Sequence, residues 1–547
     1  MTGADAPAIA APPALAPPAA PDRGAGPSAR FSLLFADPSR MPAPADPEVL
    51  RDLGLDPVFE ALAKGREEHD LLPLFRTPPT DPAETAYRQG VFRDLLAGGP
   101  VLEAVRALAA ALARVREALG RSRTLHHPIP RERWHVEAAA EYCGGIARFV
   151  EAIDRAGPRS EGLVGLAAAL RAHLEDPSFR RLAEETDALR SELDGVAYTV
   201  RIRETRVEVR RPGDEPDLAD RLAATFGRFA RANSGGRAFS FRRWDDLSPV
   251  EEAIVERVAR LYPETFARMR EFAARHREFP DPMVARIDRE LAFYLAYLGL
   301  ADRLAGQGIP FCLPAIEEEG RAMDVRGAVD LALAAPLAAA PARPGGIRPA
   351  PGRAIVPNDV LLTGPERVLI VTGPNNGGKT TFARMVGQLH YLARLGVPVP
   401  ASSARLFRSD RVFTHFARGE AAAEMRGRLM DELVRIRAIL SAATDRSVLV
   451  LNETFASATV RDAEALGRRV LERIRRLGAV GVSVTFLDEL STLGPETVSV
   501  VAEVAPDDPA IRTFRLTRRP ADGRAYALAV ARKYGLTYEI LRDGRLP

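Results

Sequence analysis

The 547-residue sequence is long enough for about three or four domains, and its 46% content of hydrophobic residues can supply their cores. Its 76 basic and 73 acidic residues leave a formal net charge of +3, which is too small to indicate a nucleic-acid partner by itself. Only three of the basic residues are lysine, so a cluster of arginines is a weak sign of DNA binding in this composition.

The first 30 residues consist mainly of alanine, proline and glycine, without a basic cluster followed by an apolar core. This composition predicts a disordered tail rather than a secretory signal. The longest apolar run elsewhere, Leu331–Ala342, is too short to span a bilayer and contains two prolines. Cys143 and Cys312 lie far apart, outside any metal-ligand spacing. We therefore expect a cytoplasmic protein with no membrane span.

Residues 31–307 show mostly helical periodicity. One helix start is well marked, because Ser248 can act as N-cap, Pro249 fits the first turn and Glu251 completes a capping box. The pattern predicts a helical core and lever with long amphipathic helices at Val101–Leu119, Glu132–Ala156, Pro249–Arg277 and Pro282–Leu304.

A β-hairpin is predicted near residues 196–210, where apolar and polar residues alternate on both sides of a short turn. Its polar positions are rich in arginine, namely Arg201, Arg203, Arg206, Arg210 and the adjoining Arg211. These side chains either contact the phosphates of a nucleic acid or form the solvated face of a hairpin in an arginine-biased chain.

Residues 308–547 have a different pattern, in which a loop rich in alanine, proline and glycine at about 334–354 precedes a strand-rich region. Short β-branched runs then alternate with helical segments, which is the rhythm of a mostly parallel sheet covered by helices. The expected strands are Val368–Thr372, Ser447–Leu451, Val480–Thr485 and Val498–Val504, and the expected helices include Thr381–Leu395 and Asp462–Leu477.

A phosphate-binding loop is predicted directly after the first of these strands, where the sequence fits the pattern G-x-x-x-x-G-K-[ST]. Its glycines let backbone N–H groups point at phosphate oxygens, Lys379 supplies a compact positive charge, and Thr380 offers a hydroxyl to Mg²⁺. The alternative is a glycine-rich turn without a ligand. The predicted nucleotide-binding residues are Gly373, Pro374, Asn375, Asn376, Gly377, Gly378, Lys379, Thr380 and Thr381.

The strand Ser447–Leu451 ends in Asn452 and Glu453, where phosphate-loop ATPases carry an acidic residue that orders Mg²⁺ and a glutamate that orients water. Asn452 can hydrogen-bond a metal-bound water but has no negative charge. Glu453 is the predicted catalytic residue, the alternative being a solvated carboxylate at a strand end. The expected cofactors are ATP and Mg²⁺, with Thr380 and Asn452 at the metal.

These residues resemble the ATPase domain of the MutS family of DNA mismatch-repair proteins. The resemblance rests on Pro357-Asn358-Asp359, the phosphate loop, Val399-Pro400-Ala401, Phe413-Thr414, and Asn452-Glu453 with Ser457, Thr459 and Asp462. Residues 525–536 are similar to the family's closing helix. The resemblance implies an α/β ABC-type ATPase domain after a helical core and lever, with the hairpin in the position of a DNA clamp. It also implies a homodimer through the ATPase domains and mismatched or branched DNA as the partner.

Several positions depart from the family pattern. Only the flexible tail precedes the helices, where the family has mismatch-reading and connector domains, and no nuclease-type domain follows the ATPase. Asn452 occupies the position of an aspartate in the family, and Phe486 that of a histidine. Gly427-Arg428 occupies the position of a serine that acts across the dimer. We therefore expect slow hydrolysis, with Arg426 or Arg428 as a substitute cation in trans.

Two alternative functions, from other classes of protein, stay open. The first is an ATP-gated switch that binds a protein partner and no DNA, and the weaker second is a small-molecule kinase. Neither the preferred DNA structure nor the pathway, whether mismatch repair or recombination, follows from the sequence.

Overall fold

The computed structural model describes residues 31–36, 44–203, 206–213, 247–339, 355–417, 425–508 and 511–521. The predicted tail at 1–30 and the predicted closing helix at 525–536 lie outside these residues. Within them, no single helix is long and apolar enough to cross a membrane, although α4 (Pro82–Leu96) and α5 (Gly99–Thr124), bent by 104° at their break, reach that length and composition together.

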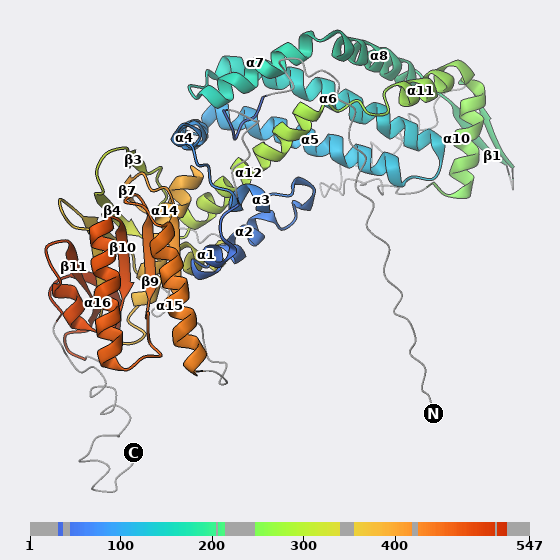
Figure 1. Cartoon of the computed structure of the whole chain (residues 1–547). Helices are drawn as coiled ribbons and strands as arrows, with labels where there is room; N and C mark the ends of the chain where they lie inside the picture. Colours follow the sequence, from blue (N-terminus) through green and yellow to red (C-terminus); the bar gives the residue numbers. More distant parts are fainter. Residues whose placement is uncertain are drawn as a thin grey trace, which may run out of the picture.

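The described residues between 44 and 305 form an elongated helical region that extends away from the sheet-containing region (Figure 1). Its two longest helices, α5 and α6, pack against each other, and Gly145 of α6 allows their close approach because a Cβ there would lie 2.7 Å from the Cβ of Ala111. Helix α6 spans Pro128–Ala156, and the other described α-helices of this region besides α4 and α5 are α1 (Pro47–Asp52), α2 (Asp56–Ala63), α3 (Leu72–Arg76), α7 (Glu161–Glu175), α8 (Pro177–Asp194), α10 (Pro249–Leu261), α11 (Pro263–Arg275) and α12 (Pro282–Ala305).

The expected single helix over Pro249–Arg277 was wrong, because the chain breaks at Tyr262 and continues as a second helix, α11. Pro263 causes the break, since proline has no N–H to donate and disfavours a helical residue before it. The predicted start was correct: Ser248 and Glu251 form the complete capping box.

The predicted hairpin is present as β1 (Thr199–Arg203) and β2 (Arg206–Arg210), paired antiparallel at the far end of the helical region (Figure 1). Its register pairs Thr199 with Arg210, Arg201 with Glu208, and Arg203 with Arg206. This register places these positions on one face of the hairpin and positions 200, 202, 207 and 209 on the other, whereas the side chains of residues 202–206 lie outside the described part of the structure.

The C-terminal region is an α/β fold, as expected, built on a six-stranded sheet of order β12-β11-β6-β10-β9-β8. Only β12 runs antiparallel to its neighbour among the described strands of this sheet. A four-stranded sheet of order β3-β7-β4-β5 lies beside it. The strands are β3 (Ala315–Glu317), β4 (Met323–Ala328), β5 (Asn358–Leu362), β6 (Val368–Thr372), β7 (Ser403–Phe407), β8 (Val412–Phe416), β9 (Val448–Asn452), β10 (Val480–Val484), β11 (Thr497–Val504) and β12 (Arg512–Arg518).

Helices cover both faces of the six-stranded sheet, which explains why β6, β9 and β10 are buried at every position. In β6, Leu369 and Val371 belong to the core that contains α14, whereas Val368 and Ile370 belong to the core of α15 and α16. The helices of this region are α13 (Leu331–Ala334), α14 (Lys379–Leu395), α15 (Met425–Ala442) and α16 (Val460–Leu477).

The first helices of the chain pack directly on the α/β region. The Asp52 carboxylate at the end of α1 accepts a hydrogen bond from Thr414 of β8 (2.7 Å) and one from Arg435 of α15 (2.9 Å). Gln388 of α14 donates to the carbonyl of Leu53, and Tyr391 donates to that of Phe75. The helical and α/β regions therefore share one continuous core.

Candidate functional site

The loop between β6 and α14 has the backbone conformation that its glycines allow. Gly373 and Gly378 have φ angles of +116° and +92°, and a Cβ on Gly373 would lie 3.0 Å from the backbone nitrogen and oxygen of Ala502. Both positions therefore require glycine. The loop leads into the first turn of α14 at Lys379, so the positive end of the helix dipole and free N–H groups meet at this point.

The Lys379 ammonium is buried and folded back onto the loop. Its Nζ donates to the carbonyls of Gly373 (2.8 Å) and Pro374 (3.1 Å) and lies 3.4 Å from Asn375 Oδ1. Desolvation lowers the pKa of Lys379, and the nearby Glu453 carboxylate partly offsets that shift. The ring of Phe486, which follows β10, lies 4.6 Å from the ammonium and is mostly exposed. An incoming phosphate must therefore replace carbonyl and aromatic partners of this lysine.

The two predicted metal-site residues lie in direct contact, since Thr380 Oγ1 donates to Asn452 Oδ1 at 3.0 Å. Both are neutral oxygen donors. The described residues contain no cluster of three or more histidine, cysteine or acidic side chains that would hold a metal. This donor set suits Mg²⁺, which keeps several waters and takes further oxygens from phosphates, better than it suits a metal bound by protein alone.

Glu453 lies at the carboxyl edge of the sheet, close enough to Lys379 to raise its pKa. Its φ of +52° is unusual for a residue other than glycine, and its N–H donates to the carbonyl of Val484 on β10. Phe455 is also left-handed, at +65°. The half-buried Glu453 thus lies in a turn with two left-handed residues, near enough to Lys379 for an electrostatic effect.

Buried hydroxyls without a hydrogen-bond partner among the described residues surround the same site. They are Oγ1 of Thr372, at the end of β6, and Oγ1 of Thr454 and Oγ of Ser457, both after β9. Such groups are costly unless another partner satisfies them.

The sequence reasoning missed the contribution of β12. Arg512 Nε donates to the carbonyl of Asn375 in the loop (3.0 Å), and Phe514, left-handed at +58°, approaches Gly378. Asn358 of β5 holds this strand by donating to the Phe514 carbonyl and accepting from the Leu516 N–H. Asn358 belongs to the Pro357-Asn358-Asp359 motif, but nothing in the β12 sequence itself marks it as part of a site.

The predicted DNA-contacting arginines lie far from this loop, at the hairpin (Figure 1). Arg201, Arg203, Arg206 and Arg210 occupy one face by register. Arg210 pairs with Glu208. Arg211 points back to the helical region, where it donates to the Leu261 carbonyl (2.6 Å) and lies 4.8 Å from the Tyr262 ring.

Arg426 and Arg428, the predicted cations for a partner's site, lie in the first turn of α15. Their side chains lie outside the described part of the structure, as do residues 418–424 before them.

Comparison with known proteins gives one family match: residues 369–545 match MutS domain V. A DNA mismatch repair protein MutS from Erythrobacter litoralis is 33% identical over 268 residues, which is 48% of this chain and 29% of that protein. One from Symbiobacterium thermophilum is 36% identical over 199 residues, or 35% and 22% of the two chains. The DNA mismatch repair protein MutS 2 of Halobacterium salinarum is 32% identical over 194 residues, again 35% and 22%. The match therefore spans less than a third of these relatives.

Proposed function

We infer, from a C-terminal region that belongs to the MutS family, that this chain is an ATP-dependent DNA-binding protein acting in mismatch repair or a related repair or recombination process. The observation that carries the nucleotide part is the contact of Thr380 with Asn452 beside Lys379, at the N-terminus of α14. Residues far apart in sequence meet there, which supports a site for phosphoryl transfer.

In this proposal the loop N–H groups and Lys379 bind the β- and γ-phosphates, and the Lys379 ammonium exchanges its loop carbonyls for phosphate oxygens. Thr380 and Asn452 would hold Mg²⁺, which neutralises charge on the phosphates when bound. Glu453 accepts a hydrogen bond from water and orients it toward the terminal phosphate.

We expect slow hydrolysis, because Asn452 brings no negative charge to the metal and Phe486 places an apolar ring where a polar group could contact the phosphates. The substitution Asn452→Asp should therefore lower the Mg²⁺ concentration needed for half-maximal activity. An unchanged Mg²⁺ dependence would argue against the metal role of this position.

The elongated helical region and its hairpin support the DNA part of the proposal (Figure 1). One hairpin face carries Arg201, Arg203, Arg206 and Arg210, which would contact phosphates without reading sequence. DNA affinity should then fall steeply with salt. Reversing the charge at the first three of these positions should weaken binding to all DNA alike.

A homodimer through the ATPase domains is the proposed assembly, with Arg426 or Arg428 of one protomer reaching the triphosphate of its partner. Alanine at both positions should then reduce the ATPase rate without changing nucleotide affinity in the monomer. An unchanged rate would remove these arginines from the mechanism.

A second candidate function is an ATP-gated switch that binds a protein partner instead of DNA. Two contacts favour it, because Glu208 pairs with Arg210 and Arg211 is engaged by the helical region, which reduces the free charge at the hairpin.

The decisive experiment measures ATPase activity and DNA binding on the same protein, with and without Mg-ATP. Homoduplex, mismatched and branched DNA are compared across a salt series, with Lys379→Ala as control. Nucleotide-dependent DNA binding that disappears in Lys379→Ala supports the DNA-binding ATPase. Nucleotide binding without DNA affinity supports the protein-partner switch instead.

A further inference from the structure

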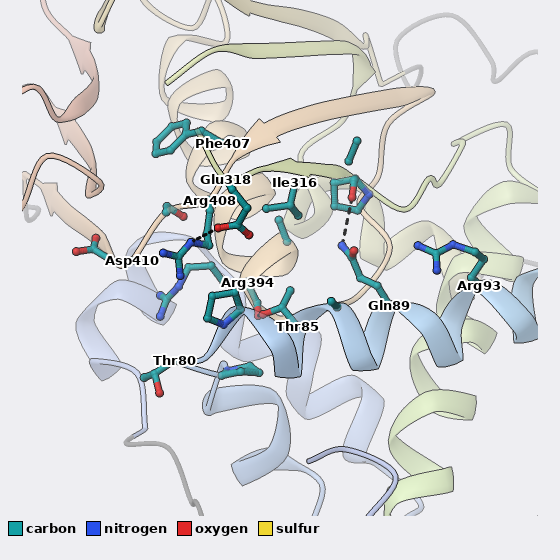
Figure 2. Close-up of a pocket in the computed structure, with 17 residues that line it drawn as sticks. Thr80, Thr85, Gln89, Arg93, Ile316, Glu318, Arg394, Phe407, Arg408 and Asp410 are labelled. Atoms are coloured by element: carbon teal, nitrogen blue, oxygen red, sulfur yellow. Dashed lines mark hydrogen bonds and ion pairs between the residues drawn. The ribbon is translucent and has the colours of Figure 1, made fainter. Parts of the chain in front are cut away.

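A pocket of about 520 Å³ lies between α4 of the helical region and the last turn of α14 (Figure 2). Its other walls are the segment Pro314–Ile316 and the turn Phe407–Asp410 after β7. Since α14 rises about 1.5 Å per residue and begins at Lys379, the pocket is roughly 20 Å from the phosphate loop. It is therefore separate from the nucleotide site, and its volume is within the range of small-molecule sites.

The middle of the pocket is apolar and shaped by rigid residues. Six of its lining residues are prolines or alanines with little side-chain freedom to lose, and Ile316 and Phe407 add a branched and an aromatic surface. Phe407 is fixed by packing against His390 of α14, with 4.9 Å between ring centroids and the ring planes tilted by 51°. A flat apolar body would bury surface here at little ordering cost to the protein.

Charged side chains gather at one end, where Figure 2 shows Arg394, Arg408 and Asp410 close together. Most of their bonding capacity is used. Arg408 Nε lies 2.9 Å from Glu318 Oε2, and the two oxygens of Asp410 accept hydrogen bonds from Thr444 (2.6 Å) and Ser447 (2.9 Å). These contacts hold the turn after β7 in place.

The guanidinium of Arg394 is the exception. It is half-buried and makes no hydrogen bond or ion pair with any residue that the structure describes. Desolvation lowers its pKa, while Tyr391 and Asp410 raise it in part. Ser409, which also lines the pocket, has a buried hydroxyl without a partner in the same described set. A buried hydroxyl without a partner and a half-buried guanidinium without a protein partner thus adjoin one apolar cavity, and a ligand oxygen would accept hydrogen bonds from both.

The opposite end of the pocket is polar and more open. Gln89 is fixed by donating to the Pro314 carbonyl (3.2 Å), and the exposed Arg93 lies one turn further along α4 (Figure 2). With Arg93 included, three arginines and two carboxylates line the cavity. The surplus of positive charge favours an anionic ligand.

We propose that this pocket binds a small organic anion, with its apolar ring body against Pro314, Ile316 and Phe407 and its carboxylate or phosphate on Arg394. Both anions match the planar fork of a guanidinium, so the shared chemistry is an oxyanion on an aromatic or similarly flat body.

The test uses isothermal titration calorimetry of the full chain with two probes, 2-naphthoate and 2-naphthyl phosphate. Each is measured on the wild type and on Lys379→Ala, so that binding at the phosphate loop is distinguished from binding in the pocket. The proposal expects binding that survives Lys379→Ala. If one probe binds more tightly, its anion, carboxylate or phosphate, is the one that the pocket prefers. Equal affinities would mean that the pocket recognises an oxyanion without distinguishing the two.

Three further variants locate the site. Arg394→Gln should weaken binding about ten-fold or more, because a hydrogen bond between charged groups is lost. Ala86→Trp, at an exposed position of α4 that lines the pocket, should abolish binding by filling it, with little risk to folding. Arg405→Gln removes a charge from an exposed position of β7 that does not line the pocket and should leave the affinity unchanged.

Failure of both probes to bind the wild type overturns the proposal. So does binding that Lys379→Ala removes, or binding that Arg394→Gln and Ala86→Trp leave unchanged. If Arg394→Gln does not fold, as judged by circular dichroism, Ala86→Trp decides. None of these results depends on whether the chain hydrolyses ATP or binds DNA.

Discussion

Glu453 is the residue on which the proposed hydrolysis depends. It follows β9 directly, with a left-handed backbone held by a hydrogen bond to Val484, and its carboxylate acts electrostatically on Lys379. Glu453→Gln keeps the shape but removes the base, so hydrolysis should fall by about 10²- to 10⁴-fold while ATP affinity is retained. Single-turnover hydrolysis and nucleotide titration measure the two effects. A rate equal to that of the wild type would reduce Glu453 to a solvated strand-end carboxylate.

His390 contributes a pH dependence to stability. It is fully buried on α14, with Nε2 3.0 Å from the sulfur of Met323, and burial lowers its pKa from 6.5 to about 3. Below pH 6.5 the unfolded chain binds a proton here that the folded chain does not, so the free energy of unfolding falls as the pH decreases from 6.5 towards 3. The slope from this group is up to about 1.4 kcal/mol per pH unit.

Urea unfolding between pH 7 and pH 5 tests this dependence. His390→Met should unfold with a shallower pH dependence than the wild type, and His126→Gln controls for the loss of an exposed imidazole. Equal slopes for His390→Met and the wild type would show that acid destabilisation comes from other groups.

At the scale of helices and strands, the close approach of α5 and α6 depends on Gly145. Because its Cβ would lie 2.7 Å from Ala111 Cβ, Gly145→Ala should destabilise the helical region by about 1–3 kcal/mol through overpacking. Gly120 of α5 has no neighbour within 4 Å of a built Cβ, so Gly120→Ala should stabilise it by up to about 1 kcal/mol. Thermal unfolding followed by circular dichroism compares the two variants. Melting temperatures that shift equally and in the same direction would contradict the packing argument.

Local signals in the sequence predicted some elements well. The hairpin, the capping box at Ser248, the strand β6 and the helix after the phosphate loop each depend on neighbouring residues, and each is present. The break at Pro263 was missed, because amphipathic periodicity continues across it while the proline acts on the backbone alone. The contribution of β12 was missed because Arg512 reaches Asn375 across 137 positions, through sheet pairing that no local pattern encodes.

At the scale of the whole molecule, the sequence did not predict the contacts between the helical region and the α/β region. Residues 31–36 are anchored on α12 by Glu290, which accepts from the Ser32 hydroxyl (2.7 Å) and the Leu33 N–H (2.6 Å). Arg88 of α4 is fully buried and donates to the carbonyls of Leu34 and of Leu395 at the end of α14. The residues that form these contacts lie between 54 and 307 positions apart in the sequence. Only the folded chain therefore shows that the helix bearing Lys379 is held at its other end by the helical region.

The last prediction concerns the contact between α1 and the α/β region. Asp52 is almost buried and joins Thr414 of β8 to Arg435 of α15, the helix that also carries Arg426 and Arg428. If nucleotide binding changes DNA affinity through the helical region, α1 is a direct contact through which that change can pass. Typical coupling between sites changes affinity by about 5- to 150-fold.

Asp52→Ala should leave ATP affinity close to that of the wild type but reduce the effect of ATP on DNA affinity to about three-fold or less. Asp56→Ala is the matched control, because Asp56 pairs with Arg76 within the helical region (2.9 Å) and touches no ATPase residue through that pair. The measurement is the ratio of DNA Kd values with and without Mg-ATP for the three proteins. An unchanged ratio in Asp52→Ala would mean that the coupling passes elsewhere, and the buried Arg88, which contacts the end of α14, would be the next residue to test. An equal decrease of the ratio in Asp56→Ala would indicate general destabilisation of the first helices.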